Sequence, residues 1–228
     1  MQSNVKKVYE LLVKSHIRNT KVEIVCKVQD IEFEVKNKDI VGNVIQSWLE
    51  VFLDNNGIAW TAPSSTQSYP DFILKDNQFL ELKCWFKEAG PAFDLANFKS
   101  LVNDLLINPK RLESDYLVFN YGYDDSGVTI NNFWIKKIWE LTTIPKRRSS
   151  HNLISSQVKD GTIYNLRPYN FIKDPSACIG SRKQFLIQMK KTIDHFSSQL
   201  IRGGGFVDGN DWLQRVSSKY KQQVGAEI

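Results

Sequence analysis

The sequence predicts a mixed α/β (α+β) fold, in which helices flank a central mixed sheet of about five strands. Segments with a helical spacing of apolar residues bracket a central group of β-branched and aromatic runs. The hydrophobic share of 42% and the charged share of 24% are typical of a globular chain. Because Gly and Pro are sparse and no low-complexity tract interrupts the sequence, we expect a single domain over residues 1–228.

The chain before residue 69 alternates between helical and strand-like spacing. In the first helix, apolar side chains recur every three or four residues from Val5 to Val13. Asp39 is placed to cap the second helix at its start, and Gly57 stands where a C-cap glycine belongs. In order, this part predicts a helix within residues 1–20, a hairpin over 22–35 that turns at 29–30, a helix over 40–55, a short strand over 58–63 and a loop over 63–68.

The remaining chain continues the same mixture of elements. Residues 116–121 form an apolar run, interrupted by Asn120, that is typical of a buried strand. Pro109 should end the helix before it, and Ser181 is placed to cap the helix that follows it. The predicted elements are two strands over 69–86 around a turn at 75–77, a helix over 94–107, a strand over 116–121, a strand and a short helix over 127–139, a basic loop over 146–151, a strand over 161–167, a helix over 181–201 and a short helix over 211–216.

The composition excludes several classes of protein. The longest apolar runs are far too short to span a bilayer, and the N-terminus lacks the pattern of a signal peptide. Three scattered cysteines (Cys26, Cys84 and Cys178) argue against a disulfide framework and for a reducing compartment. We therefore expect a cytoplasmic protein without a membrane partner. The net charge of +5 permits a polyanionic partner.

The segment Tyr69–Phe86 carries the clearest chemical pattern, because Pro70-Asp71 is followed, after nine residues, by Glu81-Leu82-Lys83. Side chains two apart on a strand share a face, so Glu81 and Lys83 should project together. The intervening turn brings the strand that Asp71 opens back beside Glu81. Two carboxylates and one ammonium should therefore converge at an edge of the sheet.

This combination suits metal-assisted phosphodiester hydrolysis. Carboxylate oxygens bind Mg²⁺, which polarises a phosphoryl oxygen and lowers the pKa of a bound water. Lys83 can orient or deprotonate that water, or stabilise charge on the phosphate. The alternative is a solvated hairpin with an exposed Glu81–Lys83 ion pair, because so short a pattern also arises by chance. The extended entry that Pro70 imposes and the alternating apolar residues of the second strand favour the catalytic interpretation.

The run YPDFILKDNQFLELKCWF resembles the active-site signature of the PD-(D/E)xK nuclease superfamily. SYPDF, ELK and FDLANF are most similar to the EcoRV-like branch of type II restriction endonucleases. AFDLANFKSLVNDLLINPKRLESDYLVFNYGY and SSQVKDGTIYNLRPYNF resemble the NgoBV/NlaIV type. The resemblance implies a catalytic core over about residues 39–200, a homodimer, Mg²⁺ dependence, and cleavage of both strands of duplex DNA at a palindromic site, GGNNCC for this type. It also implies a bacterial source, and a cognate DNA methyltransferase as a functional partner rather than a stable complex.

Placed on this sequence, the resemblance implies roles for individual residues. Asp71 and Glu81 would be the metal-binding carboxylates, and the carbonyl of Leu82 would complete the metal shell. Lys83 would be the catalytic lysine.

The superfamily often adds an acidic residue on the helix before the motif. Glu50 is the acidic candidate in this chain, and Asn43 and Gln46 are neutral alternatives on adjoining turns. The other interpretation of Glu50 is an exposed helix residue without a role in metal binding.

Basic and polar side chains outside the motif are candidates for DNA contacts. One group follows Lys146 in a loop, and the other stands at a predicted helix start, where free amides and cations can meet a phosphate. The alternative for each is ordinary surface charge. The candidates are Arg147, Arg148, His151, Asn152, Arg182 and Lys183.

Two other functions compete with restriction. A repair or junction-resolving nuclease of the same superfamily would require mismatched, damaged or branched DNA. A non-catalytic DNA-binding protein would keep the fold without the chemistry, but the intact Asp71, Glu81 and Lys83 argue against it.

Overall fold

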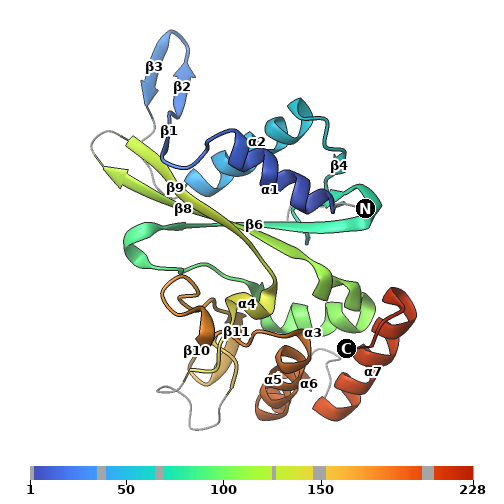
Figure 1. Cartoon of the computed structure of the whole chain (residues 1–228). Helices are drawn as coiled ribbons and strands as arrows, with labels where there is room; N and C mark the ends of the chain where they lie inside the picture. The colour runs from blue at the N-terminus through green and yellow to red at the C-terminus, as the bar shows by residue number, and fades with distance from the viewer. Residues whose placement is uncertain are drawn as a thin grey trace. The chain divides into compact units, whose positions relative to one another are not determined.

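The computed structural model describes residues 3–34, 40–64, 69–124, 127–145, 153–201 and 208–227. The chain divides into two compact units (Figure 1). The first comprises Met1–Ala92 and Asp115–Lys136, and the second comprises Phe93–Ser114 and Lys137–Ile228. The expectation of a single domain stays a prediction. Among the helices of the described segments, none is both long and apolar enough to cross a membrane.

The first unit is built on a six-stranded mixed sheet in the order β1-β9-β8-β6-β5-β4. β6 and β8 run parallel, and the other neighbouring strands run antiparallel. The strands are β1 (Thr20–Val22), β4 (Trp60–Thr61), β5 (Phe72–Leu74), β6 (Gln78–Phe86), β8 (Asp115–Asp124) and β9 (Gly127–Lys136). The mixed class is confirmed. The sheet has one strand more than about five, because Thr20–Val22 pairs with β9 before the hairpin begins.

Two helices and a hairpin complete the first unit. They are α1 (Asn4–Lys14), α2 (Val41–Asn55), β2 (Val25–Val28) and β3 (Ile31–Glu34). Ile40 is the N-cap residue of α2 and makes no side-chain cap, whereas Asp39 lies outside the described residues. Gly57 ends α2 as predicted. At its φ of 63° its N–H donates to the carbonyl of Asp54, and this closes the helix end.

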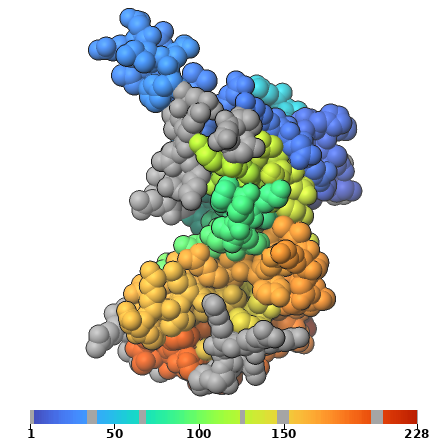
Figure 2. All heavy atoms as spheres, turned by 90° about the vertical axis from the view of Figure 1, so that its left-hand side faces the viewer, coloured from blue at the N-terminus to red at the C-terminus, as the bar shows by residue number. Residues whose placement is uncertain are grey.

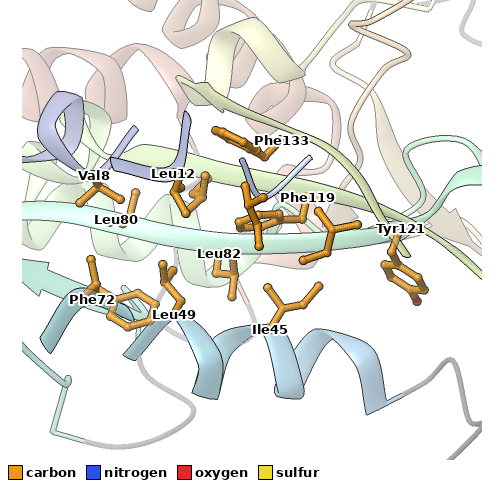
Figure 3. Packing of buried hydrophobic residues seen from close by; sticks show 14 of the residues in the cluster. Val8, Leu12, Ile45, Leu49, Phe72, Leu80, Leu82, Phe119, Tyr121 and Phe133 are labelled. Carbon is orange, nitrogen blue, oxygen red and sulfur yellow. The ribbon is translucent and has the colours of Figure 1, made fainter. Parts of the chain in front are cut away.

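The hydrophobic core of the first unit lies on one face of the sheet (Figure 3). Val8 and Leu12 of α1 and Ile45 and Leu49 of α2 are fully or almost fully buried there. They pack with apolar side chains of the central strands, among them Leu80, Leu82, Phe119 and Phe133. Each such side chain stabilises the fold by about 1.5–3 kcal/mol. Since side chains alternate along β6, the odd-numbered residues 81, 83 and 85 lie on the opposite face.

The second unit combines a small sheet with helices. Its sheet has the order β10-β11-β7, and all of its strands run antiparallel. The elements are β7 (Ala96–Asn97), α3 (Phe98–Ile107), α4 (Ile138–Leu141), β10 (Ser156–Lys159), β11 (Thr162–Leu166), α5 (Arg182–His195), α6 (Ser197–Ile201) and α7 (Gly209–Val224). Short 3₁₀ turns accompany both units.

Several predicted boundaries in the second unit were wrong. The helix expected from Asp94 begins at Phe98, because Asn97 pairs with β11 and its side chain accepts a hydrogen bond from the N–H of Ser100. The helix capped by Ser181 is confirmed, but it ends at His195 and a separate α6 follows. The last helix starts earlier than residue 211, because Asp208 caps its first turn, and it continues past residue 216 to Val224, where Gly225 ends it. β10 was not predicted.

Candidate active site

Asp71, Glu81 and Lys83 form one cluster in the first unit. The Lys83 Nζ lies 2.9 Å from Oε1 of Glu81. The backbone N–H of Asp71 donates to Oε2 of Glu81 at 3.2 Å. The backbone N–H of Leu82 donates to Oδ2 of Asp71 at 2.7 Å. The structure therefore shows the convergence that the sequence pattern predicts, whereas the catalytic roles stay predictions.

The turn between β5 and β6 produces this convergence. Residues 75–77 form a 3₁₀ turn in which Asp76 and Asn77 adopt positive φ angles of 62° and 58°, which Asp and Asn tolerate better than most residues. Phe72 then pairs with Leu80 across the two antiparallel strands. Asp71 directly precedes β5 and consequently lies beside Glu81.

Burial and the neighbouring charges shift the pKa of Asp71. Burial above all, and then the charge of Glu81, raise the pKa of Asp71 from 3.8 to about 6. The hydrogen bond from Leu82 and the charge of Lys83 oppose this rise in pKa. Glu81 itself is only 7% exposed. Two carboxylates held this close at neutral pH favour a bound cation.

The donor set fits Mg²⁺. This ion keeps several waters and binds through one or two carboxylates together with substrate phosphates, rather than in a closed protein cage. Within the described residues, no third Asp, Glu, His or Cys joins Asp71 and Glu81 in a group that could hold a metal. Two carboxylates that leave positions for water and phosphate are the arrangement that a hydrolytic Mg²⁺ centre requires.

The first turn of helix α2 packs against β6. A Cβ added to Gly42 would lie 3.9 Å from the Cβ of Cys84. Gln46 and Glu50 follow Gly42 at four-residue spacing, so they share its side of the helix. Both are half-buried, whereas Asn43 is exposed and lines a groove on another side. Glu50 is less exposed than its alternative interpretation supposed, but among the described residues it does not join Asp71 and Glu81 in a group that could hold a metal, so its role as an additional ligand stays a prediction.

The Cys84 side chain belongs to the core, as predicted. Burial raises the pKa of its thiol to about 12, so the group stays protonated and inert at neutral pH.

The structure describes only two of the six residues that were predicted to contact DNA. Arg147, Arg148, His151 and Asn152 lie outside the described residues. Lys183 is exposed on α5 in the second unit.

Arg182 has an internal role in the second unit. Its guanidinium pairs with Glu113 and lies over the ring of Tyr220, 4.5 Å from the centroid. The Tyr220 hydroxyl donates to the same carboxylate at 2.6 Å. A side chain held from two sides and only 25% exposed is less available to a phosphate than its position at a helix start suggested.

Sequence reasoning missed a polar residue on the face that carries Lys83. Trp85 follows Lys83 on that face, pairs in register with Asn120 of β8 and stacks on Trp134, with ring centroids 5.3 Å apart. Asn120 is 8% exposed, and its Oδ1 has no hydrogen-bond partner among the described residues. A buried acceptor left unpaired costs about 1–3 kcal/mol, so Asn120 is a candidate for contact with a bound molecule. The available signal was a single asparagine within an apolar run.

The chain is similar to known restriction endonucleases over most of its length. The family model described as NgoBV restriction endonuclease matches residues 2–228. The type II restriction enzyme NlaIV of Neisseria lactamica is 33% identical over 227 residues, which cover 96% of this chain and 89% of that enzyme. The type II restriction enzyme NgoBV of Neisseria gonorrhoeae is 37% identical over 140 residues, which cover 58% of this chain and 78% of that enzyme.

A solved structure of the NlaIV restriction endonuclease superposes with a TM-score of 0.86 at 27% identity, covering 100% of this chain and 92% of that one. The sequence resemblance and the mixed fold are thereby confirmed. The chain belongs to the NgoBV/NlaIV family and is a type II restriction endonuclease.

Proposed function

We propose that this enzyme hydrolyses one phosphodiester bond in each strand of duplex DNA at a short palindromic site, with Mg²⁺ as its cofactor. The observation that carries the proposal is the cluster of Asp71, Glu81 and Lys83, in which two carboxylates and an ammonium lie within hydrogen-bond distance of one another or of the adjoining backbone. The family resemblance supports GGNNCC as the recognition site.

The residues of the cluster would have different roles in the reaction. Asp71 and Glu81 would hold the metal, together with the Leu82 carbonyl. When bound, Mg²⁺ polarises the phosphate and lowers the pKa of a coordinated water. The hydrogen bond from Leu82 keeps the Asp71 carboxylate in place. Glu81 holds the Lys83 ammonium at 2.9 Å, so that Lys83 can orient the attacking water or stabilise charge on the phosphate.

Cleavage of the second DNA strand requires a second catalytic cluster. One chain offers one Asp71–Glu81–Lys83 cluster, whereas a double-strand break requires attack on two phosphates. A two-fold homodimer supplies both centres, and the same symmetry makes the recognised sequence a palindrome. Such an enzyme acts on cytoplasmic DNA, and the host's own sites then need a cognate methyltransferase as functional partner.

Plasmid cleavage tests the proposal. Two plasmids that differ only in one GGNNCC site are incubated with the enzyme and Mg²⁺, and the fragment ends are mapped. We expect a single linear product from the plasmid with the site and none from its partner. Cleavage at another short palindrome would retain the restriction function and replace the site. Cleavage confined to mismatched or branched DNA would identify a repair or junction-resolving nuclease instead.

A further inference from the structure

The face of the sheet that carries Lys83 also carries a stacked pair of tryptophans. Glu81, Lys83 and Trp85 alternate along β6, so their side chains project from the same face. The ring centroids of Trp85 and Trp134 lie 5.3 Å apart, and the ring planes meet at 26°. Stacking of this kind stabilises two aromatic side chains beyond the area that they bury. The pair is therefore a rigid apolar neighbour of Lys83.

The two tryptophan rings meet above the strand that separates them. Trp85 belongs to β6 and Trp134 to β9, and β8 lies between these strands. Val118 of β8 pairs in register with Lys83 on one side and with Trp134 on the other. Val118 is fully buried, and Trp85 is only 4% exposed. The stacked rings therefore cross β8 diagonally and form, together with Val118, an apolar wall beside Lys83, which we call the tryptophan wall.

The tryptophan wall restricts a side chain that is intrinsically flexible. Lysine carries its ammonium on a long aliphatic stem, which lies readily along an apolar surface. The Lys83 side chain is 22% exposed, and its Nζ lies 2.9 Å from Oε1 of Glu81. Glu81 precedes Lys83 on this face of β6, and Trp85 follows it. The stem is therefore held between a charged partner on one side and the tryptophan wall on the other.

Trp85 also separates the active-site cluster from an exposed turn. β6 ends at Phe86, and the 3₁₀ turn η3 (Lys87–Ala89) follows at once. The three residues of η3 are exposed, and Figure 2 shows this part of the chain, in green, at the surface of the first unit. Glu88 of this turn offers a lysine another carboxylate. Because Trp85 is buried between Lys83 and the turn along β6, its ring closes that direction to the ammonium.

We propose that Trp85 is a positioning residue: stacked on Trp134, it holds the stem of Lys83 so that the ammonium stays beside the two carboxylates during cleavage. Removing alternative rotamers of a lysine lowers the entropy that its placement costs in the reaction. A misplacement of about 1 Å in an active site can reduce the rate about 100-fold. This role of Trp85 rests on the proposed function, because it requires Lys83 to act in the reaction.

Amine labelling measures the confinement of Lys83 independently of cleavage. The metal-free enzyme is treated briefly with acetic anhydride, and mass spectrometry compares acetylation of Lys83 with that of the exposed Lys75. Trp85→Leu removes the wall, so we expect Lys83 to be acetylated several-fold faster relative to Lys75. Trp85→Phe keeps a ring that can stack on Trp134 and should retain most of the protection. Trp134→Leu removes the support of the wall from β9 and should act in the same direction as Trp85→Leu.

Phe86→Leu is the matched control for the loss of an aromatic ring from β6. Phe86 adjoins Trp85 in the strand but projects from the opposite face, where its ring lies 6.0 Å from that of Tyr121. This variant should be less stable, but Lys83 should be acetylated and DNA should be cut at the unchanged rates. Circular dichroism establishes that each variant is folded at the assay temperature. Equal acetylation of Lys83 in Trp85→Leu, Trp134→Leu and the control would overturn the proposal.

Cleavage and binding assays separate a positioning role from a purely structural one. We expect Trp85→Leu to lower the single-turnover rate at saturating DNA about 10–100-fold, with an unchanged Kd for cognate DNA in Ca²⁺. Trp85→Phe should recover most of the rate. A slow Trp85→Leu enzyme whose Lys83 keeps its protection would refute Trp85 as a positioning residue. Faster acetylation with an unchanged cleavage rate would show that the wall confines Lys83, and would contradict the role of Lys83 in the proposed function instead.

Discussion

Asp71 bears most of the electrostatic cost of the active-site cluster. Its pKa is raised by burial and by Glu81 to about 6, so between pH 3.8 and about 6 the folded state binds this proton more tightly than the unfolded chain does. The contribution of Asp71 to stability is therefore fully present below pH 3.8 and is lost as the pH rises through 6. At neutral pH the ionised, metal-free site is destabilised by on the order of 3 kcal/mol.

Asp71→Asn should accordingly stabilise the metal-free enzyme while abolishing cleavage. Asparagine can still accept the hydrogen bond from Leu82 and carries no charge. We expect a higher melting temperature than that of the unchanged enzyme at pH 7.5, a difference that shrinks toward pH 4, and no further rise on addition of Mg²⁺. Thermal unfolding with and without Mg²⁺ measures all three effects. Asp76→Asn in the exposed turn is the control, and a destabilised Asp71→Asn protein at pH 7.5 would contradict the argument.

Lys83→Ala should remove activity without unfolding the protein. Lys83 is partly exposed and forms an ion pair with Glu81. We expect the cleavage rate to fall by at least about 10²–10⁴-fold, as for other positioned proton-transfer groups, and Asp71→Ala and Glu81→Ala to be inactive as well. Single-turnover cleavage measures the rate, and circular dichroism shows whether the protein is folded. Lys75→Ala, in the neighbouring turn, should cut at the normal rate; full activity of Lys83→Ala would remove this lysine from the mechanism.

The cluster could be predicted from sequence because local geometry determines it. The alternation of a strand places Glu81 and Lys83 together, and a short turn returns the chain to Asp71. Arg182 and Asn120 could not be interpreted in the same way. The partners of Arg182 are Glu113 and Tyr220, both distant in sequence, and the position of Asn120 depends on a parallel pairing between strands.

The contact between α5 and α7 is the element-scale feature that depends most on a single residue. Gly209 opens α7, and its N–H donates to Asp194 of α5 at 2.8 Å. An added Cβ would lie 2.6 Å from Oδ1 of Asp194 and 2.8 Å from the backbone carbonyl of Lys190. The carbonyl belongs to a helix and cannot move without shifting α5.

Gly209→Ala should therefore destabilise the protein, although alanine is the better helix former. We expect a loss of about 1–3 kcal/mol in the free energy of unfolding, as for other overpacked sites. Gly42→Ala in α2 is the matched control. Its Cβ would meet only ordinary contacts at 3.9 Å, so it should be neutral or stabilising by less than about 1 kcal/mol. Urea unfolding compares the two variants, and equal stability of both would show that the helices adjust freely.

Long elements could be predicted and short ones could not. α1, α2, β6 and β8 have enough residues for their periodicity to be visible, and each was predicted. β1 and β7 have only three and two residues, so they exist through pairing with distant strands rather than through local pattern. The length of α7 was underestimated, although Trp212, Val216 and Tyr220 continue one buried stripe at four-residue spacing.

At the scale of the whole molecule, binding and catalysis should respond differently to the metal. Ca²⁺ is larger than Mg²⁺ and accepts looser coordination, so it can bridge the carboxylates and a phosphate without placing a water well for attack. We expect Ca²⁺ to support binding of cognate DNA without cleavage, and subsequent Mg²⁺ to start the reaction. Fluorescence anisotropy and gel analysis of the same sample follow both steps. Cleavage in Ca²⁺ alone, or in excess chelator, would contradict the metal mechanism.

Two-fold symmetry should also be visible in the DNA complex. Since each chain has one catalytic cluster and the duplex has two scissile phosphates, two chains should bind each palindromic site. The net charge of +5 per chain implies that the pair releases counterions on binding, so affinity should fall steeply and linearly on a log–log plot against salt concentration. Sedimentation in Ca²⁺ with a labelled duplex gives the stoichiometry, and a salt titration gives the slope. A duplex with half of the palindrome scrambled is the matched control, and it should be nicked in the intact half alone. A complex of one chain per duplex that still cuts both strands in a single encounter would require another route to the second phosphate.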